Sequence, residues 1–143
     1  MIRQKIHRPE ISLERGKAAP PGYYASNLSF VVDFVLSRNS HLIAFTQLNG
    51  LTAFVGLSEP AKRLFSRLLI RTGPVFLVSS LSYKEIPDLT SAIRELKAAG
   101  LIDSKGVSGE ALLRKLTKEQ ISDGFPLVKT STTKKTLIAQ VLS

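Results

Sequence analysis

The central part of the chain, residues 58–102, has an apolar and polar pattern that predicts two helices separated by a short strand. Ser58 is a good helix N-cap, and Pro60 follows where no backbone donor is needed. Apolar side chains then recur at helical spacing on one buried face: Ala61, Leu64, Phe65, Leu68 and Leu69. The first helix is expected to end at Gly73-Pro74, with its arginines on a side that points away from the core.

The strand is predicted at residues 75–78, which are too few and too β-branched for a helix. Asp88 then opens a second helix that closes at Gly100. Its apolar stripe leaves four polar side chains on the outer side: Thr90, Ser91, Arg94 and Lys97. A helix, a strand, a turn and a capped helix in this order predict a winged-helix unit.

The flanking segments predict helical support before this unit and a helical module after it. Residues 1–21 are read as a basic flexible arm, for which a solubilising tail is favoured over a phosphate-binding role. Residues 22–106 form the helical and winged-helix domain. In it, a helix from Tyr23 packs on a helix over 41–55 that is broken at Asn49-Gly50. Residues 107–143 form a SAP-like helical hairpin, so the fold class is mainly α with a short β element.

Charge favours a polyanionic partner. The 143 residues carry a net charge of +9 with 43% hydrophobic residues, as expected of a folded basic protein. The charge is concentrated at +3 in residues 1–17, +3 in 58–71 and +4 in 104–143. Because no run of about 18 apolar residues and no signal core is present, nucleic acid is preferred over a membrane and a cytoplasmic, nucleoid-associated location is expected. The absence of Cys excludes disulfides and thiolate metal sites.

No catalytic residue, metal site or cofactor is predicted. Pro87-Asp88 and Glu95-Leu96-Lys97 spell a nuclease-like PD…ExK pattern, but seven helical residues separate the two carboxylates by about 10 Å, too far to share one metal ion. His7 and His41 are isolated. Phosphate-binding loops and nucleophile elbows are absent from the sequence.

Binding is therefore the predicted activity, through cations that would contact phosphate oxygens. The candidate residues are Arg63, Arg67, Arg71, Arg94, Lys97, Lys129, Lys134 and Lys135. Three tyrosines could stack on exposed bases, although core packing is the favoured interpretation for them: Tyr23, Tyr24 and Tyr83.

The order of these pieces resembles the amino-terminal region of the Fanconi-associated nuclease family, bacterial type. The resemblance covers about residues 22–143 and rests on GYYASNLSFVVDFV, the RLLIRTGP turn, Tyr83-Lys84-Glu85-Ile86 and the helix ending in AGLI. It implies a winged-helix and SAP-containing DNA-binding region. In the family, a helical repeat region and a metal-dependent VRR nuclease domain follow, but the sequence stops at Ser143 before them.

The leading hypothesis is a non-catalytic DNA-binding module of a repair nuclease that is selective for flap or branched DNA. A separate or downstream nuclease portion would be its partner. One alternative is a winged-helix transcription regulator, which would bind one duplex sequence as a dimer. The other is a basic protein-interaction or inhibitor module, which would meet an acidic protein and show no DNA affinity at moderate salt.

Overall fold

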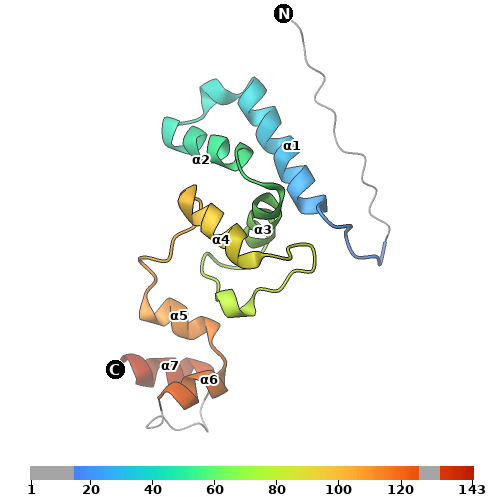
Figure 1. Ribbon diagram of the computed structural model, residues 1–143. Helices are drawn as coiled ribbons and strands as arrows, with labels where there is room; N and C mark the ends of the chain where they lie inside the picture. Colours follow the sequence, from blue (N-terminus) through green and yellow to red (C-terminus); the bar gives the residue numbers. More distant parts are fainter. Residues whose placement is uncertain (1–14, 126–132) are drawn as a thin grey trace, which may run out of the picture. The chain divides into compact units, whose positions relative to one another are not determined.

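The computed structural model describes residues 15–125 and 133–143. Over these residues the chain forms seven α-helices and two short 3-10 helices, without a β-strand (Figure 1). The mainly α fold predicted from the sequence is confirmed. None of the described helices is long and apolar enough to cross a lipid bilayer. Most of the predicted basic arm, residues 1–14, lies outside the described residues.

The chain divides into two compact units. Unit 1 is drawn from Met1–Arg71 and Ser82–Asp103, and unit 2 from Thr72–Leu81 and Ser104–Ser143. The chain therefore passes from one unit to the other three times. The predicted domains, 1–21, 22–106 and 107–143, stay predictions.

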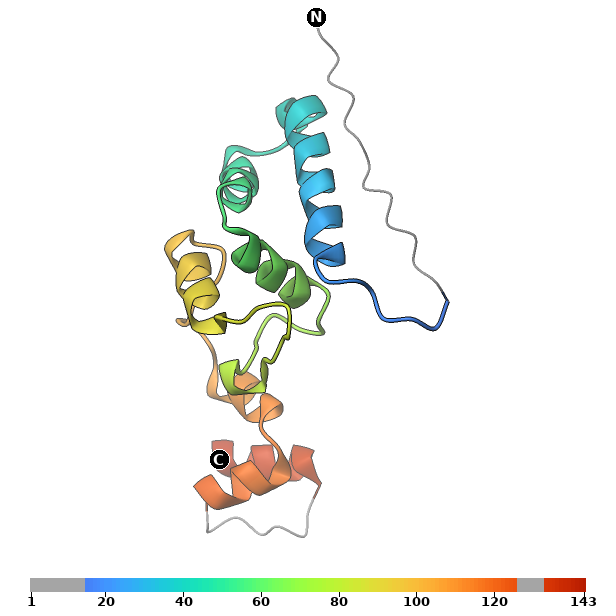
Figure 2. The ribbon, with the colours of Figure 1, turned by 45° about the vertical axis from the view of Figure 1, so that its right-hand side comes forward.

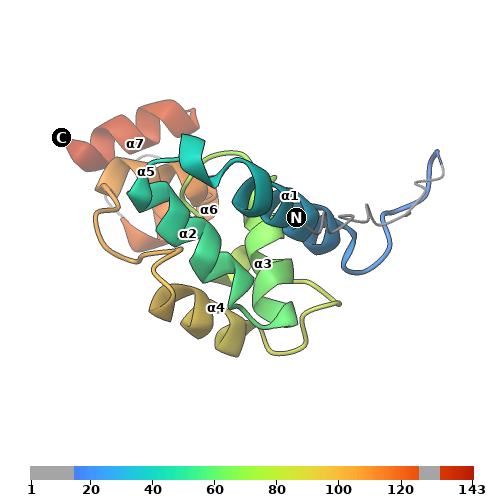
Figure 3. The same cartoon turned by 90° about the horizontal axis from the view of Figure 1, so that it is seen from above.

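In unit 1, α3 (Glu59–Leu69) is the central helix. It packs against both α1 (Tyr23–Arg38) and α4 (Leu89–Ala98), as Figure 2 shows, while α2 (Phe45–Val55) packs against α1. Seen from above, α4 lies next to α3 (Figure 3). Leu64 of α3 and Leu96 of α4 are both 0% exposed, so both side chains belong to the core of this unit.

The ends of α3 and α4 follow the predicted caps. Ser58 Oγ accepts a hydrogen bond from Ala61 N at 3.4 Å, and Asp88 Oδ1 accepts one from Ser91 N at 3.0 Å. Gly100, with φ +72°, closes α4, and the next residue donates its amide to the Leu96 carbonyl at 3.1 Å. These local signals fixed the helix boundaries to within a few residues.

One position of the predicted α3 stripe is wrong. Leu69 is 56% exposed, whereas Ser66 is only 3% exposed. The Ser66 hydroxyl donates to the Arg63 carbonyl at 2.9 Å, which satisfies it inside the core.

Two further local expectations differ from the structure. The predicted strand at residues 75–78 is absent: Val75–Leu77 has no regular structure and leads into the 3-10 helix Val78–Ser80. A strand needs a pairing partner, and the described residues contain none. Helix α2 also runs unbroken through Asn49-Gly50, and the break comes earlier, at Ile43-Ala44, where the backbone is extended. A helical glycine costs only about 1 kcal/mol, which packing against α1 can offset.

Unit 2 contains three short helices, α5 (Gly109–Lys115), α6 (Lys118–Gly124) and α7 (Lys134–Leu142). A helical module was predicted for residues 107–143. Thr117 and Gln120 form a capping box at the start of α6. The shared core consists of Leu113, Ile121, Leu137 and Ile138, with Leu116 and Val141 packed on it.

The segment Thr72–Leu81 belongs to unit 2 although helices of unit 1 precede and follow it. Lys115 of α5 attaches it, since its Nζ donates to the Thr72 carbonyl at 3.2 Å and lies 5.8 Å from the centroid of the Phe76 ring. Unit 2 is therefore not a contiguous C-terminal piece.

Leu64→Ala should lower the free energy of unfolding of unit 1 by about 2–5 kcal/mol, because it leaves a cavity between α3 and α4. The matched control is Leu69→Ala on the same helix, which removes the same atoms from an exposed site and should cost less than about 1 kcal/mol. Urea unfolding followed by circular dichroism measures both. Equal losses would contradict the assigned core.

Candidate nucleic-acid interface

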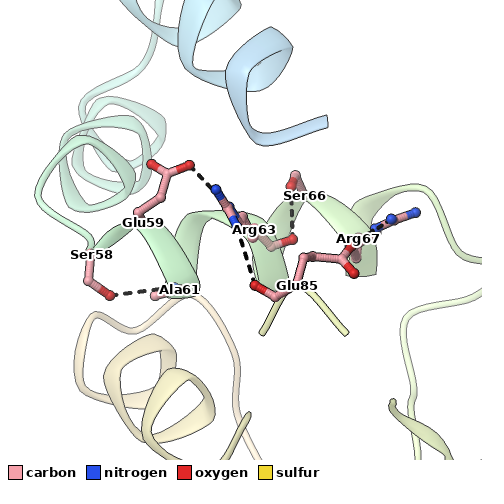
Figure 4. A network of polar contacts seen from close by, with 7 residues as sticks. All are labelled: Ser58, Glu59, Ala61, Arg63, Ser66, Arg67 and Glu85. Atoms are coloured by element: carbon pink, nitrogen blue, oxygen red, sulfur yellow. Dashed lines mark hydrogen bonds and ion pairs between the residues drawn. The ribbon is translucent and has the colours of Figure 1, made fainter. Parts of the chain in front are cut away.

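The arginine side of α3 faces Glu85 (Figure 4). Arg67 donates from Nε and Nη2 to Glu85 Oε1 at 2.8 and 2.6 Å. One turn earlier Arg63 Nη1 donates to the Glu85 carbonyl at 3.3 Å, and Figure 4 shows the two side chains on either side of Glu85. One turn later Arg71 Nη1 donates to Tyr83 Oη at 3.1 Å. We call these three side chains, spaced four residues apart, the arginine ladder.

Arg63 and Arg67 share one side of α3, as predicted, and Arg71 lies two residues beyond the end of the helix at Leu69. Arg63 and Arg67 do not point freely into solvent. The side chains of Arg63 and Arg67 are 30% and 27% exposed. Arg63 also pairs with Glu59 at 3.3 Å. Their predicted contact with phosphate stays a prediction, and it would compete with these internal bonds.

Tyr24 and Tyr83 both lie against Arg67. Its Cζ is 4.6 Å from the centroid of the Tyr24 ring and 5.7 Å from that of Tyr83. Tyr23 meets Tyr24 edge to face at 5.3 Å. All three tyrosines are half-buried. These contacts favour the packing interpretation over base stacking, which stays a prediction.

Glu85 was missed by the sequence reasoning. Its side chain is 13% exposed, and a hydrogen bond from its own backbone amide, with the bond and charge of Arg67, lowers the pKa of its carboxyl. A signal was present, because Glu85 is the only acid between Glu59 and Asp88, a stretch that contains five cations: Lys62, Arg63, Arg67, Arg71 and Lys84.

Glu95 of α4 holds the start of α3. Its two carboxylate oxygens accept from the backbone amide and the hydroxyl of Ser58, each at 2.6 Å. The hydroxyl and then the amide lower the pKa of Glu95. Asp88 serves as the N-cap of α4, as predicted, so both carboxylates of the nuclease-like pattern have structural partners. Residues 15–125 and 133–143 contain no group of three or more His, Cys, Asp or Glu that could hold a metal ion.

The outer side of α4 is polar, positive and exposed. Its members are Thr90, Ser91, Arg94 and Lys97. Neither Arg94 nor Lys97 has a hydrogen bond or salt bridge to another described residue, although Arg94 lies near enough to Asp88 to help lower the pKa of that carboxyl, after the hydrogen bonds from Ser91. We call Thr90, Ser91, Arg94 and Lys97 the outer face of α4.

Some cations of unit 2 are bonded within the unit, and others are exposed. Lys134 Nζ donates to the Arg114 carbonyl at 2.5 Å, and Arg114 pairs with Glu110 at 2.6 Å. Lys135 and Lys118 are exposed. The predicted contact residue Lys129 lies outside the described residues.

The model of one family, described as "FAN1, HTH domain", matches residues 22–103, which is more than half of the chain. The chain belongs to the FAN1 family. The resemblance to the Fanconi-associated nucleases seen in the sequence is thereby confirmed. The FAN1 match takes in all of α1–α4 and with them the arginine ladder and the outer face of α4.

Curated FAN1 relatives, each named Fanconi-associated nuclease 1 homolog, agree with this assignment. The rice protein is 42% identical over 56% of this chain, and the Arabidopsis thaliana protein 37% identical over 57%. The Pseudomonas aeruginosa protein is 30% identical over 73%. The chain spans only 8%, 9% and 19% of the lengths of these FAN1 relatives.

A solved FAN1 structure has the same fold. It is a crystal structure of paFAN1 bound to a DNA with a 2-nucleotide 5′ flap and a gap. It superimposes with a TM-score of 0.77 and 28% identity, over 87% of this chain and 24% of the other. The fold of this chain is therefore one that occurs within a DNA-bound FAN1.

Acid should weaken the attachment of α4 to α3. Folding lowers the pKa values of Glu85 and Glu95 below 4.5, so these carboxylates stabilise the fold fully above that pH and lose their contribution as the pH falls through the lower folded-state values. Glu95→Gln should lower the thermal midpoint at neutral pH, and its difference from the native chain should shrink as the pH falls below 4.5 and Glu95 becomes protonated.

The matched control is Glu110→Gln, which removes the same charge from an exposed pair with Arg114 and should change the midpoint little. A deficit of Glu95→Gln that is the same at every pH would rule out titration of Glu95 as its cause.

Proposed function

We propose that the chain is a DNA-binding module of a FAN1-type repair nuclease and that it holds flap or branched DNA through phosphate contacts. The observation that carries this proposal is the outer face of α4, where Arg94 and Lys97 are exposed and make no salt bridge with a described residue. Such cations can neutralise phosphates without first breaking internal bonds. Membership of the FAN1 family and the likeness to a flap-bound relative support the same ligand.

In this proposal the module itself does not cut DNA, and a separate or downstream nuclease portion supplies the chemistry. The occupied carboxylates of Asp88 and Glu95 support a non-catalytic role for this part of the chain. A cytoplasmic, nucleoid-associated location goes with a DNA ligand. The winged-helix and SAP-like descriptions of the two regions are part of the proposal, and the helical order of α3–α4 and α5–α7 supports them.

The test compares binding of the full chain to a flap DNA, a plain duplex and an unrelated flap sequence. A repair module should prefer the flap whatever its sequence. A dimer that selects one duplex sequence would support a transcription regulator instead, and no DNA affinity at moderate salt would support an acidic protein partner.

Replacing Arg94 and Lys97 together by Ala should weaken flap binding. It should also reduce the slope of log affinity against log salt by about 1.8, which is about 0.9 for each lost phosphate contact. The control double variant is Arg38→Ala with Lys62→Ala, which removes equal charge from side chains that lie over Phe34 and Phe54 at 5.2 and 5.8 Å. An equal change of slope in both double variants would exclude a specific role for α4.

DNA binding by unit 2 is tested with point variants rather than by truncation, because removing residues 108–143 would take away the partners of Thr72–Leu81. If unit 2 binds the same DNA, Lys118→Gln with Lys135→Gln should also reduce the salt slope, by up to about 1.8. Lys134→Gln, which loses an internal bond to Arg114, serves as a comparison for purely structural effects. An unchanged slope in the Lys118 and Lys135 variant would assign these two exposed lysines no phosphate contact.

A further inference from the structure

We infer that Glu85 is a positioning residue for DNA binding and that the arginine ladder holds α4 in place rather than contacting phosphates itself. This inference rests on the proposed function, since it takes the outer face of α4 as the DNA-binding surface. It gives the ladder arginines a role different from the one that their charge and spacing predict.

The bonds of the ladder all end on one short segment. Arg63 and Arg67 of α3, and Arg71 just beyond its end, reach Tyr83–Glu85 through a carbonyl, a carboxylate and a phenol hydroxyl. The strongest contact is at the centre, where Arg67 donates twice to a single oxygen of Glu85. Charge-assisted bonds of this kind are about twice as strong as bonds between neutral groups. The segment is therefore held along its length by α3.

The central arginine is poorly available to a phosphate. Both the Arg67 and Glu85 side chains are more than two-thirds buried, and Tyr24 and Tyr83 lie against the guanidinium. A phosphate that took Arg67 would leave Glu85 as a largely buried, unpaired carboxylate, which is costly. Arg94 and Lys97 carry no such penalty.

The segment held by the ladder leads directly into α4. Ile86, 3% exposed, follows Glu85 and donates its amide to the Tyr83 carbonyl at 3.1 Å, and the N-cap Asp88 comes two residues later. Further along α4, Glu95 is bonded to Ser58. Helix α4 is thus attached to α3 both ahead of its first turn and within its length. Two such attachments fix how far α4 is rotated about its own axis and therefore where Arg94 and Lys97 point.

The experiment measures binding of a duplex carrying a single-stranded 5′ flap across a salt series, with the full chain. The variants are Glu85→Gln, Arg67→Lys, Tyr83→Phe and the double variant of Arg94 and Lys97. The matched control is Glu59→Gln, which removes the same charge from the exposed partner of Arg63. Each variant is assayed below its own thermal transition, so that loss of folded protein does not enter the measurement. Tyr83→Phe removes only the hydroxyl that accepts from Arg71 and is the variant least able to disturb folding.

If the ladder positions α4, Glu85→Gln should weaken binding about tenfold at every salt concentration with an unchanged slope, because the phosphate contacts remain but are misplaced. Arg67→Lys should do the same, since it keeps the charge but not the forked geometry. Tyr83→Phe should have a smaller effect in the same direction, and Glu59→Gln should bind as tightly as the native chain.

Changes of affinity or salt slope in the opposite direction overturn the inference. Tighter binding and a steeper slope in Glu85→Gln would mean that Glu85 masks arginines that contact DNA, and native affinity in Arg67→Lys would mean that charge alone matters. Native affinity in folded Glu85→Gln and Tyr83→Phe would reduce the ladder to a stabilising contact. If the Arg94 and Lys97 variant keeps the native slope, the proposed surface itself is wrong and the inference falls with it. If only that variant responds, the surface stands and the inference alone fails.

Discussion

The attachment of α4 to α3 is the interaction on which the arrangement of unit 1 depends. Leu64 and Leu96 are both buried where α3 and α4 pack, but apolar contacts are not directional. Direction comes from two carboxylates, Glu85 and Glu95, each of which bonds to a different part of α3. Acidic residues therefore organise a basic helix of a basic chain. Arg94 and Lys97, by contrast, lie on the exposed side of α4.

Much of the fold could be predicted because its signals are local. Ser58, Asp88 and Gly100 mark helix ends through bonds that span only a few residues, and the sequence identified each of them. The predicted strand at 75–78 failed because propensity says nothing about whether a partner strand exists. The predicted break at Asn49-Gly50 failed because packing against α1 outweighs the weak helix propensity of two residues.

The candidate site was less predictable, because its contacts are not local in the sequence. The spacing of Arg63 and Arg67 correctly placed them on one side of α3, but a pattern within one helix cannot reveal what lies opposite it. Glu85 is 18 residues from Arg67 in sequence, and Glu95 is 37 residues from Ser58. Such pairings depend on the tertiary fold. Exposed Arg94 and Lys97, in contrast, follow directly from the apolar stripe of α4, and the sequence placed them on its outer side.

The long separation between Ser58 and Glu95 has a consequence for how the protein forms during synthesis. When α3 leaves the ribosome, its own hydroxyl cap is present, but the carboxylate that completes the cap has not yet been made. The apolar side of α3 that α4 covers stays open until at least residue 96 has emerged. Loop closure over 37 residues costs only slightly more than over half that length, so the delay is set by translation rather than by chain entropy. The packing of α4 on α3 is thus expected to form after the packing of α3 on α1, whose residues are all made earlier.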